Sequence, residues 1–250
     1  MGCSSSVPAL PADVEDALRA GNDPPPDVQN RFAGVKEISA WDGDVLHPAL
    51  SLASGDVAVF SYMEGRLADP HSLKFFWKLD SFNGYRLGTT FANLNVCSTG
   101  GMLGSTIYQI TNSADRLVVN FLKKGGRLWW ILAPSDHDKS KPLFTLSKAT
   151  RNFMGGSSVW QLHKYDKAKS AAGPEILYVV NLGEPNSIVR YFYRSKAGAS
   201  ADDSRQQFIA MSAPHGHHGS LVVRGEVDAA LVLAANSIID TADTRDRAYS

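Results

Sequence analysis

The first six residues carry the clearest chemical signal in this sequence. The chain begins MGCSSS, with Gly2 after the initiator methionine and a serine at position 6. This pattern is typical of N-myristoylation, because removal of the methionine exposes an unhindered glycine α-amine. Once the myristoyl chain enters a bilayer, the neighbouring thiol lies at the membrane surface. We therefore predict a myristoyl group on Gly2 and a palmitoyl group on Cys3.

The charge of the N-terminal segment bears on how that anchor works. Residues 1–30 contain five acidic residues and one arginine, a net charge of −4. A single myristoyl chain binds membranes only marginally and needs a second signal. Anionic lipids would repel a negative segment, so the second signal is expected to be palmitate on Cys3. The expected location is the cytoplasmic face of a membrane, the plasma membrane first, and otherwise the cytoplasm.

Basic residues form a second group of candidates. Lys123, Lys124 and Arg127 lie in a turn between two expected strands, and Arg190 and Arg194 lie along another strand. If these positions meet at one rim of the fold, each contributes about 1 kcal/mol near an anionic membrane surface. We consider them candidate headgroup contacts, and the alternative is an ordinary solvated rim.

Other chemically active patterns are weaker. His215, His217 and His218 could bind Zn²⁺, but a Gly-flanked run between two strands is typical of a hairpin tip, so no metal site is predicted. The glycine-rich residues 100–106 lack the lysine of a phosphate-binding loop. Cys97 has no context of a catalytic thiol and fits a buried strand position. We expect no catalytic residue and no cofactor.

Composition narrows the class of protein. The 250 residues are 44% hydrophobic and 20% charged, which is ordinary for a globular protein. A formal net charge of zero argues against nucleic-acid binding, which needs a basic excess. Two cysteines are too few for a disulfide scaffold, and no run of 18 apolar residues is present.

The chain divides into an N-terminal tether and one β-rich domain. Residues 1–34 hold many prolines, one short expected helix at 13–20 and a polyproline spacer at 24–26, so we expect a Pro-rich, largely disordered tether. Residues 35–250 are expected to form the domain. Short β-branched and aromatic runs with turn residues between them predict antiparallel strands at 57–62, 73–79, 85–96, 104–111, 116–122, 128–133, 143–146, 159–165, 176–182, 187–194, 207–212 and 220–223.

One segment near the C-terminus differs from the strands. Residues 228–240 read DAALVLAANSIID, and nine of the 11 residues from 229 to 239 are apolar and cover every face of a helix. Thirteen residues span about 20 Å, which is too short for a bilayer core of about 30 Å. A closed β-barrel around this helix would bury it. The alternative, a helix on one face of a sandwich, would leave apolar side chains in water.

These segments resemble the LURP-one-related family of the tubby C-terminal-like superfamily. The strongest likeness is residues 222–240, and 244–248 continue it. The likeness covers residues 110–250 well and 56–110 poorly, and inserts near 167–173 and 196–203 depart from the family pattern. The remaining matching segments are 142–148, 160–164, 176–180 and 207–212.

The resemblance implies a closed antiparallel barrel of about 12 strands around a hydrophobic central helix. Such a fold is related to tubby, a phosphoinositide binder, and to phospholipid scramblases. The expected function is a non-enzymatic, membrane-tethered adaptor or phospholipid-binding module whose partners are membrane phospholipids or another protein. The alternative is scramblase-like lipid translocation.

The anchor is tested by the substitution Gly2→Ala. Without the glycine α-amine no myristoyl chain is attached, so the protein should move from the membrane fraction to the soluble fraction of eukaryotic cells. Fractionation and immunoblotting measure this distribution. An unchanged distribution would show that the predicted acylation does not hold the protein at membranes.

Overall fold

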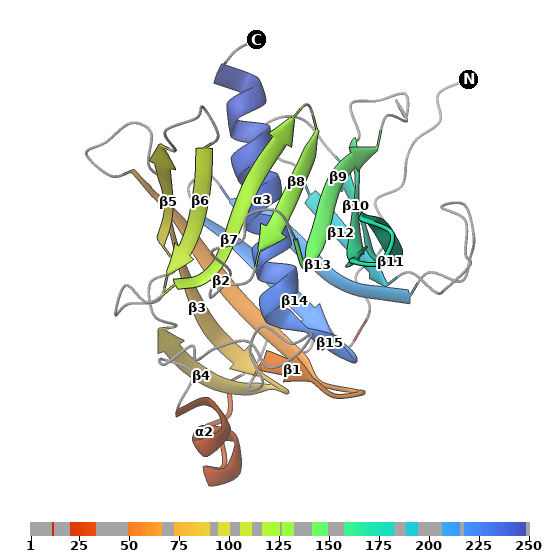
Figure 1. Ribbon diagram of the computed structural model, residues 1–250. Helices are drawn as coiled ribbons and strands as arrows, with labels where there is room; N and C mark the ends of the chain where they lie inside the picture. The colour runs from red at the N-terminus through yellow and green to blue at the C-terminus, as the bar shows by residue number, and fades with distance from the viewer. Residues whose placement is uncertain are drawn as a thin grey trace, which may run out of the picture.

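The structure, a computed structural model, describes residues 12, 21–33, 50–66, 73–90, 95–100, 106–111, 117–125, 127–132, 142–149, 158–182, 189–194, 207–215 and 218–248. Within these ranges the chain is mainly β, with the helices α2 (Pro26–Ala33) and α3 (Ala229–Ala248) (Figure 1). This confirms the predicted mainly-β class. The helix expected at 13–20 lies outside the described residues.

The strands follow one another along the chain with antiparallel pairing throughout. Each of the 12 predicted strand segments contains or overlaps a strand of the structure. The strands are β1 (Ser51–Leu52), β2 (Val57–Arg66), β3 (Leu73–Phe82), β4 (Tyr85–Thr90), β5 (Asn95–Gly100), β6 (Thr106–Thr111), β7 (Leu117–Gly125), β8 (Leu128–Leu132), β9 (Phe144–Ala149), β10 (Ser158–Asp166), β11 (Ala171–Leu182), β12 (Val189–Arg194), β13 (Gln207–His215), β14 (His218–Arg224) and β15 (Val227–Asp228).

The described strands form one large sheet and one small one. The large sheet has 13 strands in the order β2-β14-β13-β12-β11-β10-β9-β8-β7-β6-β5-β3-β4. Strand β2 pairs with β14 along one side and with β3 along the other. The small sheet joins β1 to β15, immediately before α3.

The sheet has two faces with different roles, because successive side chains of a strand point to opposite sides. In β2, Ala58 and Phe60 belong to the main core. Val57 and Val59 point the other way and form a separate small cluster with Val222 of β14. The main core therefore lies on the face that contacts α3, and the second cluster lies on the opposite face.

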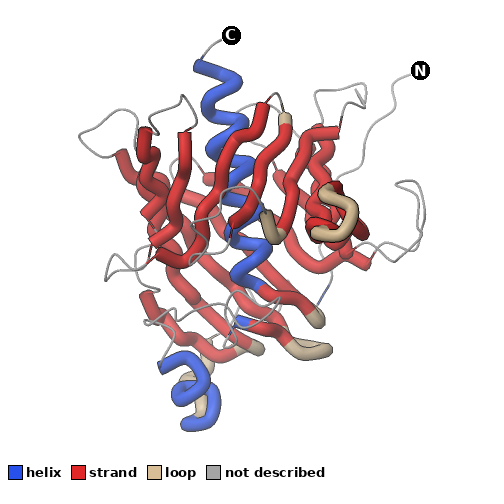
Figure 2. The backbone as a smooth tube through the Cα atoms, viewed as in Figure 1, coloured by secondary structure: helices blue, strands red, loops and turns tan. Residues whose placement is uncertain are grey.

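Helix α3 supplies the centre of the main core. Its residues from Leu231 to Ile239 are all buried, and its apolar members share one cluster with the inward residues of the strands. Strands lie on both sides of this helix along most of its length, and its C-terminal end extends beyond them (Figure 2). Asp228 begins the helix, since its carboxylate accepts a hydrogen bond of 2.9 Å from the backbone N–H of Ala230.

The helix is longer than the sequence pattern predicts. The predicted helix ends at Asp240, whereas α3 runs from Ala229 to Ala248 and has 20 residues in all. The added residues 241–248, TADTRDRA, contain no glycine or proline that would end a helix. Polar composition therefore marks the end of the apolar run and not the end of the helix.

Residues 26–33 correct the predicted tether. They form α2, whose Val28 and Phe32 are buried in the main core. Pro26 takes the first helical position, where its missing N–H costs nothing, so the proline run is read better as a helix start than as a spacer. The Phe32 ring packs edge-on against Phe82, with ring centroids 4.9 Å apart.

Arg31 connects α2 to the sheet. Its Nη2 donates a hydrogen bond of 2.8 Å to the carbonyl oxygen of Ser51, and its Nη1 lies 3.4 Å from Oδ2 of Asp56. Its guanidinium also stands 4.8 Å from the ring centre of Phe82. Residue 22 adds a further link, because its carbonyl oxygen accepts a hydrogen bond of 2.8 Å from the backbone N–H of Arg86 in β4.

The docking of α2 is tested by Phe32→Ala. Removing a buried aromatic side chain costs about 3–5 kcal/mol of unfolding free energy, whereas a residue of a tether would cost almost nothing. Urea denaturation followed by tryptophan fluorescence measures the change. Asn30→Ala, an exposed position of the same helix, is the matched control. Equal stability of the two variants would contradict the docking.

Candidate functional site

A cluster of basic residues lies at the end of the sheet reached by the C-terminal half of α3 (Figure 1). Lys123 and Lys124 end β7, and Arg127 precedes β8 across a short turn. Lys148 of β9 joins them, because its backbone N–H donates a hydrogen bond of 3.0 Å to the carbonyl oxygen of Arg127. We call these four residues the cationic rim. The structure therefore places Lys123, Lys124 and Arg127 together, as predicted.

Each lysine of the cationic rim lies near a tryptophan. The Nζ atom of Lys124 stands 4.0 Å from the ring centre of Trp130, and that of Lys123 stands 5.9 Å from Trp129. Lys148 is 5.5 Å from Trp160 in the same way. A cation over an aromatic face gains about 0.5–1 kcal/mol at exposed sites, so these lysines are held close to the strands.

The rim presents positive charge to solvent. Lys124 and Arg127 are exposed, and Trp130, which lies near Lys124, is half-buried. The stretch 117–132 that holds this hairpin contains no aspartate or glutamate. Without a carboxylate in the hairpin itself, the exposed cations suit an anionic ligand, and an aromatic ring lies next to Lys124.

Arg190 corrects the prediction that it contacts a headgroup. Its side chain is only 3% exposed and lies inside the sheet, where Nη1 forms an ion pair with the Asp240 carboxylate of α3. The same Nη1 donates a hydrogen bond of 3.2 Å to Oδ1 of Asn236. The physical reason is strand alternation: Arg190 shares the inward face of β12 with the fully buried Phe192.

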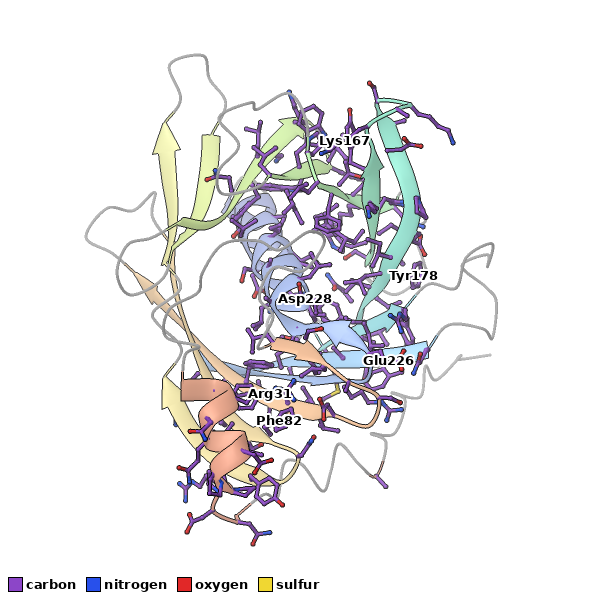
Figure 3. All side chains as sticks on the ribbon, turned by 60° about the horizontal axis from the view of Figure 1, so that its bottom comes forward. Arg31, Phe82, Lys167, Tyr178, Glu226 and Asp228 are labelled. Carbon is purple, nitrogen blue, oxygen red and sulfur yellow. The ribbon has the colours of Figure 1, made fainter. Side chains whose placement is uncertain are left out.

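Arg194 lies on that same face of β12 but at the opposite end of α3 from the cationic rim. It lines a pocket of about 360 Å³ that opens beside the N-terminal end of α3. Figure 3 turns this end forward, with Asp228 at the start of the helix and Glu226 beside it. The pocket is lined by Ser51, Leu52, Phe144, Lys164, Ile176, Leu177, Arg194, Glu226, Val227, Asp228 and Leu231.

Opposite charges meet at the mouth of this pocket. Nη1 of Arg194 lies 3.6 Å from Oε2 of Glu226, which forms an ion pair. The carboxylate of Asp228 caps α3 at Ala230, and Lys164 adds a second cation from β10. Arg194 thus does not join the predicted cationic rim, and the pocket is a second, separate candidate site.

Shifted pKa values occur away from both sites. Burial raises the pKa of Tyr193, and burial together with the neighbouring Tyr193 raises the pKa of Tyr191. The pKa of Asp166 is lowered, first by a hydrogen bond of 3.2 Å from the backbone N–H of Lys169. At neutral pH the two phenols therefore stay protonated and the carboxyl stays ionised.

Several predicted positions lie outside the described residues. These include the lipidation sites Gly2 and Cys3, as well as His217. His215 ends β13 and pairs with His218 at the start of β14, which confirms that the histidine run lies at a hairpin. Within the ranges that the structure describes, no three His, Cys, Asp or Glu side chains lie close enough to hold a metal ion.

Among the helices within the described ranges, none is both long and apolar enough to cross a bilayer.

Comparison with known protein families, with curated proteins and with solved structures finds no match to this chain.

Sequence reasoning missed two features of these sites. The pairing of the rim lysines with tryptophans depends on cross-strand register, which the sequence does not state, although the run LWW after Arg127 is a signal. Lys164 could have been found by alternation, because it follows Trp160 and Leu162 at period 2 on the inward face of β10.

The buried ion pair of Arg190 is tested by Asp240→Asn. Removing one partner leaves a buried charge without its counter-ion, which should lower the unfolding free energy by about 3–5 kcal/mol in urea denaturation. The control is Glu226→Gln, which breaks the more exposed pair with Arg194 and should cost about 0–1 kcal/mol. Similar small losses in both variants would mean that the inner pair contributes little.

Proposed function

We propose that this protein is a non-enzymatic, membrane-tethered module that binds anionic phospholipids. The single observation that carries the proposal is the cationic rim, in which Lys124 and Arg127 are exposed and Nζ of Lys124 stands 4.0 Å from the ring centre of the half-buried Trp130. Tryptophan is enriched where proteins meet the membrane–water interface, since its ring is apolar and its N–H is polar. Lysine and arginine beside it match the phosphate charge of a headgroup.

Electrostatics sets the size of the effect. Each basic residue near the surface of an anionic leaflet gains about 1 kcal/mol, so two exposed cations supply only a weak interaction by themselves. A lipid anchor would make that interaction sufficient, because it holds the rim at a high effective concentration near the membrane. The rim and the anchor therefore complement one another.

The proposed anchor is a myristoyl amide on Gly2 with a palmitoyl thioester on Cys3. Acylation of Gly2 forms an amide bond between its α-amine and the acyl carbonyl, and releases the thiol of the acyl donor. Two chains give stable attachment where one is only marginal. This arrangement places the module at the cytoplasmic face of a membrane, with the plasma membrane as the first candidate.

We further propose that the sheet is a closed barrel of the tubby C-terminal-like type around α3. Strand pairing supports closure, since β2 pairs with β14 and β3, and the remaining strands connect these two in an unbroken order that leaves out only β4. The burial of α3 on all sides supports a central helix. Membership of the LURP-one-related family rests on the sequence resemblance and on this arrangement.

Lipid binding is tested by removing the two exposed charges of the rim. The variant Lys124→Gln/Arg127→Gln should lose about 2 kcal/mol, or about thirtyfold in affinity, for vesicles that contain phosphatidylserine. Co-sedimentation with vesicles measures the affinity. Pure phosphatidylcholine vesicles should show no difference between the variant and the original protein.

A second variant controls for the loss of charge in general. Lys78→Gln/Arg86→Gln also removes two positive charges from exposed positions, on β3 and β4, which do not pair with the strands of the rim. It should bind as the unchanged protein does. If both double variants bind equally to the anionic vesicles, the cationic rim is not the binding surface. Translocation of lipid between leaflets by the acylated protein would instead favour a scramblase.

A further inference from the structure

The pocket beside the N-terminal end of α3 has walls suited to an apolar ligand. Leu52, Phe144, Leu177 and Leu231 are each at most 5% exposed, and they come from four different elements. A volume of about 360 Å³ lies at the lower end of the range for small-molecule sites, which is about 300–1,000 Å³. The pocket therefore suits a slender apolar group more than a bulky ring system or a two-chain lipid.

The charges at the mouth argue against an anionic end on that ligand. The lining includes two cations, Lys164 and Arg194, and two carboxylates, Glu226 and Asp228. Arg194 is paired with Glu226 at 3.6 Å. Since the charges balance, a phosphate or a free fatty-acid carboxylate gains no net attraction here. An uncharged polar end, such as an amide, would meet donors and acceptors without disturbing this balance.

Helix α2 contacts one of the residues that line the pocket. Ser51, which lines the pocket, accepts the hydrogen bond of 2.8 Å from Arg31 of α2. Closer to the N-terminus, Asn22 forms an isolated β-bridge with Tyr85 of β4. Residues 2–21 can reach at most about 70 Å when fully extended, whereas α2 is only about 12 Å long. The chain is thus long enough to bring Gly2 to the pocket.

From these three observations we propose that the pocket binds the N-terminal acyl chain of the protein itself. A myristoyl group on Gly2 has both properties that the pocket favours in a ligand, because it is a slender apolar chain that ends in an uncharged amide. This site rests on the myristoylation proposed above. Each methylene gains about 0.8 kcal/mol on leaving water, in the pocket or in the bilayer, so the two compete for the same chain.

The first experiment uses the non-acylated full chain and a synthetic N-myristoylated peptide of residues 2–7 with an amidated C-terminus. Saturable binding is expected by calorimetry, and the same peptide without the acyl group should not bind. Ile176→Trp, which fills the half-buried wall of the pocket, should abolish the binding. Val180→Trp is the matched control on the same strand but outside the pocket, and it should bind normally.

The second experiment asks whether the pocket holds the chain when it is attached. The myristoylated full chain with Cys3→Ser, checked by intact mass, is mixed with phosphatidylcholine vesicles. If the pocket holds the acyl chain in two thirds of the molecules, only one third of them can insert it into a vesicle. Ile176→Trp releases the chain in all molecules, so it should raise partition into vesicles about threefold. Nuclear Overhauser contacts between a ¹³C-labelled acyl chain and Leu52 or Leu231 give a readout that needs no variant.

Two results would overturn the site. They are an absence of peptide binding by the non-acylated chain, or equal partition of Ile176→Trp and Val180→Trp with no contacts from the labelled chain. Failure of the underlying anchor is seen separately, because protein from eukaryotic cells would then show no acyl mass on Gly2. Peptide binding by the non-acylated chain does not depend on that result.

Discussion

Helix α3 has apolar side chains around its whole circumference, and this sets the main constraint on the structure. A helix of this kind needs protein on every side, and strands lie on both sides of it (Figure 2). Two buried polar residues of its described part also have hydrogen-bond partners within the protein. Ser237 and Thr241 donate hydrogen bonds of 3.0 Å and 2.8 Å to carbonyl oxygens one turn earlier in α3. The ion pair of Asp240 with Arg190 then links the helix to β12.

Much of this fold could be predicted from the sequence, because its signals are local. Runs of β-branched and aromatic residues between turn residues predicted the strands, and an apolar run predicted the start of α3. Residues 85–96 were predicted as one strand but form parts of β4 and β5. The two-residue strand β1 has too few residues to show any pattern. Helix α2 was missed because three prolines favour a spacer, and because the contacts that stabilise it, Phe32 with Phe82 and Arg31 with Ser51, join residues far apart in the sequence.

The candidate sites were less predictable, because alternation does not say which face of a strand is inward. In β12, Phe192 and Arg190 lie on one face, while the aromatic Tyr191 and Tyr193 lie on the other. Both faces look suitable for burial, and so an arginine expected in solvent lies in the core. By contrast, Lys124 and Arg127 flank the tight turn between β7 and β8, where exposure is the usual outcome.

Helix α2 and the cationic rim lie at opposite ends of α3 (Figure 1). In the proposed function, attachment to the membrane and contact with its headgroups would therefore involve different ends of the domain. Attachment and orientation need not come from the same part of the chain. The 20 residues of α3 span about 30 Å, and residues 2–21 can extend to roughly twice that. An acyl anchor on such a length permits either end of the domain to face a bilayer. The anchor would then determine only that the protein stays close, and surface charge would determine which end touches the lipid.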